Sequence, residues 1–152
     1  MNLAKYVKPG RIGLDLEASN KASAIGELLE ILADAGAVPM DRTAEIRQAL
    51  LERETQASTG LGYGVAIPHL KTDLVDEIQV AFGRSAEGIE FEAADGQAVH
   101  FVFLVLAPVQ KACDYLKVLS MIAVLVKDKD NRRELLRAKT TEDIIKVLDK
   151  TA

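Results

Sequence analysis

The chain has 152 residues, of which 49% are hydrophobic and 28% are charged, a composition typical of one soluble globular domain. Its formal net charge of -4 disfavours a broadly basic surface for nucleic acid, and the one cysteine, Cys113, excludes an intramolecular disulfide and a cysteine-rich zinc site. The start of the chain lacks the apolar run of a signal peptide, and the most apolar segment, residues 101–107, is too short to cross a bilayer. We therefore expect a cytoplasmic protein without membrane insertion.

The first third of the chain carries one strand pattern and two helical patterns. Residues 11–16 are apolar at alternate positions, which predicts a short strand. Two segments with helical apolar spacing follow, at residues 19–36 and 41–54, and they predict amphipathic helices. Residues able to cap these helices stand at their starts: Ser19 or Asn20 for the first, and Asp41 for the second.

The middle of the chain has a different composition. Residues 59–70 combine three glycines with Pro68 and small side chains, which predicts a loop with short strand segments. Residues 77–84 alternate in polarity and predict a strand, and residues 94–97 have the composition of a turn. Residues 99–107 form a nearly continuous apolar run, which predicts a central strand covered on both faces.

From residue 111 onward the pattern is helical. One apolar stripe is expected to face inward: Leu116, Leu119, Ile122, Ala123 and Val126. Because this helix is apolar almost all round, it is either buried on most sides or forms a docking patch near His69 that includes Val118 and Met121.

The end of the chain predicts two more helices. Residues 132–138 form a short one, and Thr140 or Thr141 is positioned to cap the last. Helices at both ends of a few strands predict the α/β class. We expect residues 1–152 to form a single-domain α/β sandwich, with a small mixed sheet flanked by helices.

The segment that ends at His69 carries the groups for phosphoryl chemistry. It has no complete dinucleotide fingerprint and no P-loop lysine, so it does not predict a nucleotide site. A neutral imidazole can attack phosphorus directly and form a phosphoramidate. Arg53 offers a charged donor fork, and Ser58, Thr59 and backbone amides offer neutral donors to the developing charge. Each residue alone is common at ordinary surface positions, and their coincidence predicts an anion-handling site that needs no metal or cofactor.

These residues also resemble a known family. The matching segments are Arg53-Glu54, Ser58 to Gly62, Val65 to His69, Ile89 to Phe91, Asp95 to Val99 and Leu116 to Leu119. They resemble the enzyme IIA domain of the fructose/mannitol class of the bacterial sugar phosphotransferase system, a family that includes the nitrogen-regulatory enzyme IIA proteins. The length suits a stand-alone protein and favours the nitrogen-regulatory branch.

The resemblance implies a phosphocarrier. His69 would accept a phosphoryl group from the phosphocarrier HPr or its nitrogen-branch counterpart, and Arg53 and Ser58 would steady the phosphate. Family members then pass the group to a cysteine on a IIB domain, or use their phosphorylation state to control partners such as potassium transporters and sensor kinases.

Three residues depart from the family pattern. Tyr115 stands where the family commonly has a second histidine, Tyr63 where Asn is common, and Leu70 where Gly is frequent. Tyr115 can donate a hydrogen bond to phosphate or orient His69, but it cannot supply the positive charge of an imidazolium. The other histidine, His100, lies on the predicted central strand and is expected to be structural. Two alternatives stay open: a non-catalytic regulatory binding module with a degenerate site, and a sensor whose glycine-rich loop binds a small anion.

Overall fold

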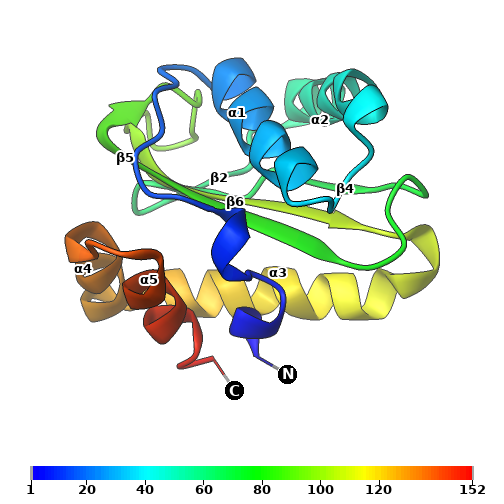
Figure 1. Ribbon diagram of the computed structural model, residues 1–152. Helices are drawn as coiled ribbons and strands as arrows, with labels where there is room; N and C mark the ends of the chain where they lie inside the picture. Colours follow the sequence, from blue (N-terminus) through cyan, green and yellow to red (C-terminus); the bar gives the residue numbers. More distant parts are fainter. Residues whose placement is uncertain (1, 152) are drawn as a thin grey trace.

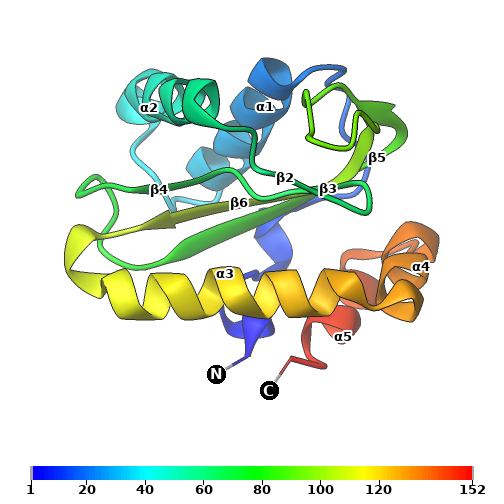
Figure 2. The ribbon, with the colours of Figure 1, turned by 180° about the vertical axis from the view of Figure 1, so that it is seen from behind.

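The computed structural model describes residues 2–151, which form three layers (Figures 1 and 2). A sheet lies between helices α1 and α2 on one face and α3, α4 and α5 on the other. The helices are α1 (Lys21–Asp34), α2 (Thr43–Gln56), α3 (Ala112–Lys127), α4 (Lys129–Arg137) and α5 (Thr141–Leu148). The strands are β1 (Ile12–Gly13), β2 (Gly60–Gly62), β3 (Val65–Ala66), β4 (His69–Lys71), β5 (Gln79–Ile89) and β6 (Val99–Ala107).

The sheet has the strand order β1-β5-β6-β3-β2, and β4 also pairs with β6. The β5 and β2 strands run antiparallel to their neighbours β6 and β3, whereas β3 and β4 run parallel to β6. Val65 pairs with Phe101 and His69 with Val105, so β3 and β4 follow one another along the same side of β6. The sheet is therefore mixed and flanked by helices, which confirms the predicted fold class.

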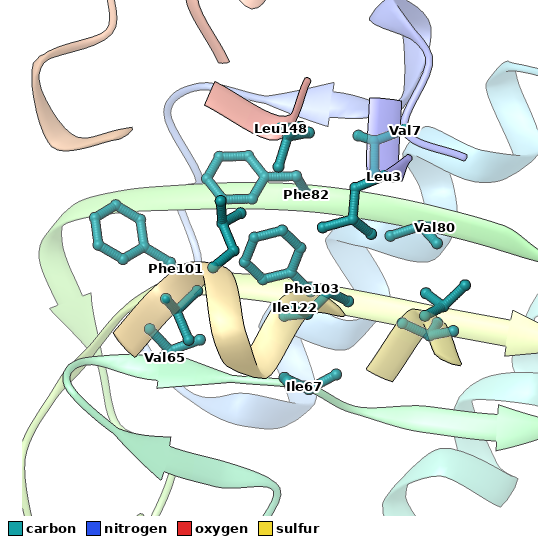
Figure 3. Close-up of a cluster of buried hydrophobic side chains, with 14 of the residues drawn as sticks. Leu3, Val7, Val65, Ile67, Val80, Phe82, Phe101, Phe103, Ile122 and Leu148 are labelled. Atoms are coloured by element: carbon teal, nitrogen blue, oxygen red, sulfur yellow. The ribbon is translucent and has the colours of Figure 1, made fainter. Parts of the chain in front are cut away.

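The central strand is β6, with the bounds that the sequence predicts, and it is buried on both faces. On the face toward α3, Phe103 packs against Phe82 of β5, with ring centroids 4.9 Å apart in an edge-to-face arrangement (Figure 3). On the other face, Leu104 packs in the core formed with α1 and α2. Burying each such side chain stabilises the fold by roughly 1.5 to 3 kcal/mol. The well-packed β6 therefore holds β3 and β4, which pair with it, in defined positions.

The starts of α1 and α5 agree with the sequence, because the predicted capping residues form their local hydrogen bonds. The Asn20 side chain accepts from the Ser23 N–H at 2.9 Å, and Thr140 and Asp143 form a reciprocal capping box at the start of α5. The α4 helix begins at Lys129, before the predicted residue 132, because Asp128 caps it and accepts from the Asp130 N–H at 2.8 Å.

Two predictions for the first third of the chain are wrong. The strand expected over residues 11–16 is limited to β1, because the Leu14 carbonyl accepts from Arg84 Nε at 3.0 Å instead of joining a ladder. Asp41 does not cap α2. It lies inside a short 3-10 turn, Met40–Arg42, so α2 begins at Thr43 with Arg42 at the capping position and no side-chain cap.

The buried face of α3 also differs from the prediction. Leu116 is 64% exposed, whereas Val118 is fully buried and cannot belong to a docking patch. The side chains that α3 buries are Tyr115, Val118, Ile122, Leu125 and Val126. The strand β5 continues to Ile89, past the predicted end at Arg84, through a register irregularity in its pairing with β6. Within residues 2–151 no helix combines the length and apolar character needed to span a membrane.

Candidate functional site

His69 begins β4 beside the central strand. It pairs with Val105 of β6, whose N–H donates to the Pro68 carbonyl at 2.9 Å. Val105 belongs to the core beneath α3, and residues paired across neighbouring strands point to the same face of a sheet. The half-buried His69 side chain therefore points toward α3 from a rigid position rather than from a mobile loop.

The ring of His69 is oriented by its own backbone. Its Nδ1 lies 2.6 Å from the carbonyl oxygen of Ile67, two residues earlier. A carbonyl oxygen can only accept, so this contact requires a proton on Nδ1, which then donates. In the neutral ring the lone pair is consequently on Nε2, the ring atom that could act as a nucleophile.

A pocket of about 410 Å³ opens beside His69, between the end of α2, the segment that begins β2, and α3. Tyr115 of α3 adjoins it, with its ring centroid 5.9 Å from that of His69 and the two planes inclined by 54°. The polar residues that line the pocket are Arg53, Ser58, Thr59, His69 and Ser120, and the large apolar ones are Leu61, Ile67 and Leu119. The structure thus brings together all of the site residues that the sequence predicts.

Arg53 lies in the last turn of α2, where the chain turns toward the pocket. Its Nη1 donates to the Ala57 carbonyl at 3.1 Å, which fixes the guanidinium over the turn that leads to Ser58. A guanidinium has five N–H donors. One internal hydrogen bond therefore leaves donors for an anion that enters the pocket.

The two neighbouring hydroxyls have different partners. Ser58 Oγ donates to the Phe91 carbonyl at 3.2 Å and accepts from the Gly60 N–H at 3.1 Å. Thr59 is buried, and its hydroxyl donates to the carboxylate of Glu54. A hydroxyl has one proton to donate, and both residues give it to an internal acceptor. Thr59 gives its proton to a buried carboxylate, whereas half-buried Ser58 can rotate toward an anion by giving up its bond to the neutral Phe91 carbonyl.

Tyr115 supplies a neutral group to the wall of the site. Its side chain is buried, and this burial raises the pKa of its phenol to about 12, although the positive charge of Arg53 acts in the opposite direction. The phenol therefore keeps its proton at physiological pH. It remains a potential hydrogen-bond donor that carries no charge.

Sequence reasoning missed Glu54 and the contribution of α3 beyond Tyr115. Glu54 is buried in the last turn of α2 and contacts Thr59. A signal for its burial was present, because Glu54 follows Ile46 and Leu50 at the four-residue spacing of the inward face. Leu119 lines the pocket, together with Ser120 and Ala123, because it lies one helical turn after Tyr115.

Two further residues singled out in the sequence, His100 and Tyr63, have clear surroundings. His100 lies outside this pocket, and its Nδ1 contacts the Ser85 carbonyl at 2.8 Å, in agreement with a structural position. Tyr63 has a φ of 58°, the left-handed region that Asn tolerates better than Tyr. The guanidinium of Arg132 lies 4.7 Å from the centroid of the Tyr63 ring, within the range of a cation–π interaction.

Comparisons with known proteins find matches over nearly the whole chain. A family model described as "Phosphoenolpyruvate-dependent sugar phosphotransferase system, EIIA 2" matches residues 5–151. The chain is 42% identical to the "PTS system fructose-specific EIIA component" of Haloferax volcanii, over 90% of this chain and 88% of the relative. It is 36% identical to the "Nitrogen regulatory protein" of Bradyrhizobium diazoefficiens, over 97% of this chain and 95% of the relative.

Solved structures show the same fold. The nitrogen regulatory protein IIA-Ntr from Neisseria meningitidis superimposes with a TM-score of 0.87 at 31% identity, covering 96% of this chain and 98% of that protein. The mannitol enzyme IIA of Escherichia coli, solved in complex with its phosphorylated enzyme IIB, gives a TM-score of 0.77 at 24% identity, covering 93% of this chain and 97% of that one.

Proposed function

The chain belongs to the EIIA 2 family of the phosphoenolpyruvate-dependent sugar phosphotransferase system, a family of phosphocarriers, and we propose that His69 is the residue that carries the phosphoryl group. The match over residues 5–151 confirms the family resemblance noted in the sequence. The observation that carries the assignment is the Nδ1 contact with Ile67, which leaves the Nε2 lone pair free on a ring that lines one pocket with Arg53 and Ser58. We further propose that residues 1–152 act as one enzyme IIA unit in the cytoplasm.

The proposed reaction is an in-line transfer between two nitrogen nucleophiles. Nε2 of His69 attacks the phosphorus of a phosphohistidine on an HPr-type donor. A nitrogen–phosphorus bond forms at His69, the bond to the donor's histidine breaks, and the donor's ring nitrogen keeps the electron pair. The Nδ1 proton stays on His69, where the Ile67 carbonyl stabilises the positive charge that the ring acquires.

The pocket supplies the donors that this transfer needs. Charge that develops on the phosphoryl oxygens is met by the remaining N–H groups of Arg53 and by the hydroxyl of Ser58. Thr59 takes no direct part, because its hydroxyl proton is directed to Glu54. Tyr115 adds one neutral donor at the place where the family commonly has a second histidine.

The partners follow from both branches of the family. The relatives include a fructose-specific component and nitrogen regulatory proteins, and the mannitol enzyme IIA forms a complex with its phosphorylated IIB. We propose an HPr-type phosphocarrier as the donor, and a IIB domain or a regulated transporter or sensor kinase as the downstream partner. The intact arrangement around His69 favours a live phosphocarrier over a non-catalytic binding module with a degenerate site.

The test is phosphorylation measured by intact mass. The protein is incubated with phosphoenolpyruvate, enzyme I and the cognate phosphocarrier, and one acid-labile, alkali-stable phosphoryl group is expected. His69→Ala should abolish the adduct. The matched control is His100→Ala, which removes the other histidine and should leave the adduct in place. A wild-type protein that gains no phosphoryl group, or an adduct that survives His69→Ala, would refute the assignment and favour the binding module.

A further inference from the structure

Glu54 is a buried carboxylate beside the site that the proposed reaction does not use. It is 4% exposed, in the last turn of α2, next in sequence to Arg53. A buried carboxylate is costly unless hydrogen bonds satisfy it. Both of its oxygens accept from a single residue: Oε2 from the Thr59 backbone N–H at 3.2 Å, and Oε1 from the Thr59 hydroxyl. These two bonds fix the position and the direction of the Thr59 backbone.

Thr59 is in turn connected to His69. Its carbonyl accepts from the Ile67 N–H at 3.1 Å, and the Ile67 carbonyl accepts from His69 Nδ1 at 2.6 Å. Each bond joins a different segment to the next: the end of α2, the residue before β2, the residue after β3 and the start of β4. A continuous chain of hydrogen bonds thus runs from the Glu54 carboxylate to the ring of His69.

We propose that Glu54 is a positioning residue for His69, which acts through Thr59 and Ile67 to hold the ring with Nδ1 protonated and Nε2 facing the pocket. The inference rests on the proposed phosphorylation of His69 and adds to it a residue that touches neither the ring nor the phosphate. It also accounts for the burial of Thr59, because both of its donors satisfy the buried Glu54 carboxylate. Ser58 makes no contact with that carboxylate and is only half-buried.

The proposal concerns geometry rather than charge, and two substitutions of Glu54 separate the two. Glu54→Gln keeps the shape and both contacts, because its amide oxygen can accept from the Thr59 N–H while its amide nitrogen donates to the Thr59 hydroxyl. Glu54→Leu keeps similar bulk but leaves the buried Thr59 N–H without a partner. Only Glu54→Leu should release the Thr59 backbone.

The first measurement does not depend on phosphorylation. Long-range ¹H–¹⁵N NMR spectra of the unphosphorylated protein report which ring nitrogen of His69 carries the proton. Wild type and Glu54→Gln should show the Nδ1–H form, whereas Glu54→Leu should show a mixture of both tautomers. A merely structural carboxylate would lower stability without moving this equilibrium.

The second measurement is the rate of phosphoryl transfer from the phosphorylated HPr-type donor. Glu54→Leu should lower kcat by about ten- to hundredfold, the range expected for a small misplacement of a reacting group. Its KM for the donor should stay within roughly twofold, because Glu54 is not on the surface that a donor meets. Glu54→Gln should retain kcat within roughly threefold, and Glu52→Gln, an exposed glutamate on the same helix, is the matched control.

Glu54→Met provides the same test if Glu54→Leu does not fold. Its unbranched side chain has a length similar to that of glutamate and likewise leaves the Thr59 N–H without its acceptor. The proposal is overturned if folded Glu54→Leu or Glu54→Met retains the wild-type tautomer and kcat, or if the loss is in KM alone. If wild-type protein accepts no phosphoryl group, the proposed function fails, and the tautomer measurement still decides whether Glu54 positions His69.

Discussion

Replacing Tyr115 by phenylalanine removes one hydroxyl from the wall of the His69 site, and we expect it to change how stability depends on alkaline pH. The side chain is 7% exposed, and burial raises its pKa from the usual 10.0 to about 12, with Arg53 opposing part of that rise. Because the folded-state pKa is above the unfolded-state value, the unfolded chain releases this proton first as pH rises. The contribution is therefore intact below pH 10 and is lost as pH passes through about 12.

The magnitude follows from those two pKa values. At about pH 11 the wild-type protein should have lost about 1.4 kcal/mol of unfolding free energy that Tyr115→Phe protein does not lose. The assay is urea unfolding of both proteins at about pH 8 and about pH 11, followed by circular dichroism. Other groups titrate in both proteins, so their effects cancel in the difference. Tyr63→Phe, which removes an exposed hydroxyl, is the matched control.

Equal losses of stability in wild type and Tyr115→Phe between the two pH values would contradict this reasoning. Such a result would show that the phenol meets as much water in the folded protein as in the unfolded chain. The neutral donor that we place beside His69 would then lack its physical basis.

Two further predictions concern residues around the pocket. Arg53→Ala should slow phosphorylation of His69 by about a hundredfold, and Arg53→Lys, which keeps the charge but loses the donor fork, should be intermediate in single-turnover assays; an unchanged rate in Arg53→Ala would remove the guanidinium from the mechanism. Tyr63→Asn should relieve about 1 kcal/mol of left-handed strain and lose about 0.5 to 1 kcal/mol of cation–π attraction to Arg132. Tyr63→Asn should therefore change the free energy of unfolding little in the wild-type background and raise it by about 1 kcal/mol in an Arg132→Ala background. Equal changes in both backgrounds would exclude an interaction between Tyr63 and Arg132.

Local sequence signals predicted helix starts correctly where the deciding interaction is itself local. The caps at Asn20 and Thr140 depend on atoms within three residues, and both are present. Asp41 has the same chemistry, but the chain around it forms a 3-10 turn closed by the Arg42 N–H to Pro39 carbonyl bond, which places Asp41 before the start of α2. In α3 the buried face was misplaced although a signal was present. Lys117, Ser120 and Lys127 recur at helical spacing and lie on the exposed side, and Leu116 is next to them, which explains its exposure.

The candidate site was predictable to the extent that it is contiguous. Ser58, Thr59 and His69 lie in one glycine-rich segment, and Arg53 lies shortly before it in the sequence. The role of Glu54 was not predictable, because it depends on how α2, β3 and β4 meet in space. The same holds for Thr59, whose hydroxyl is equivalent to that of Ser58 in sequence and differs only in the direction that its backbone gives it.

The charge at the pocket determines what a partner protein meets there. Among the pocket-lining residues that the structure describes, Arg53 carries the one fixed charge, and the Tyr115 phenol beside it stays neutral at physiological pH. A phosphoryl group brings about two negative charges near neutral pH, so phosphorylation of His69 would reverse the local charge from positive to negative. A protonated histidine at position 115 would offset part of that reversal in mildly acidic conditions. Because such a histidine would add its charge to both forms, the phosphorylated site would be close to neutral. With Tyr115 the sign of the local charge reverses on phosphorylation, which favours a contact that distinguishes the two forms by charge.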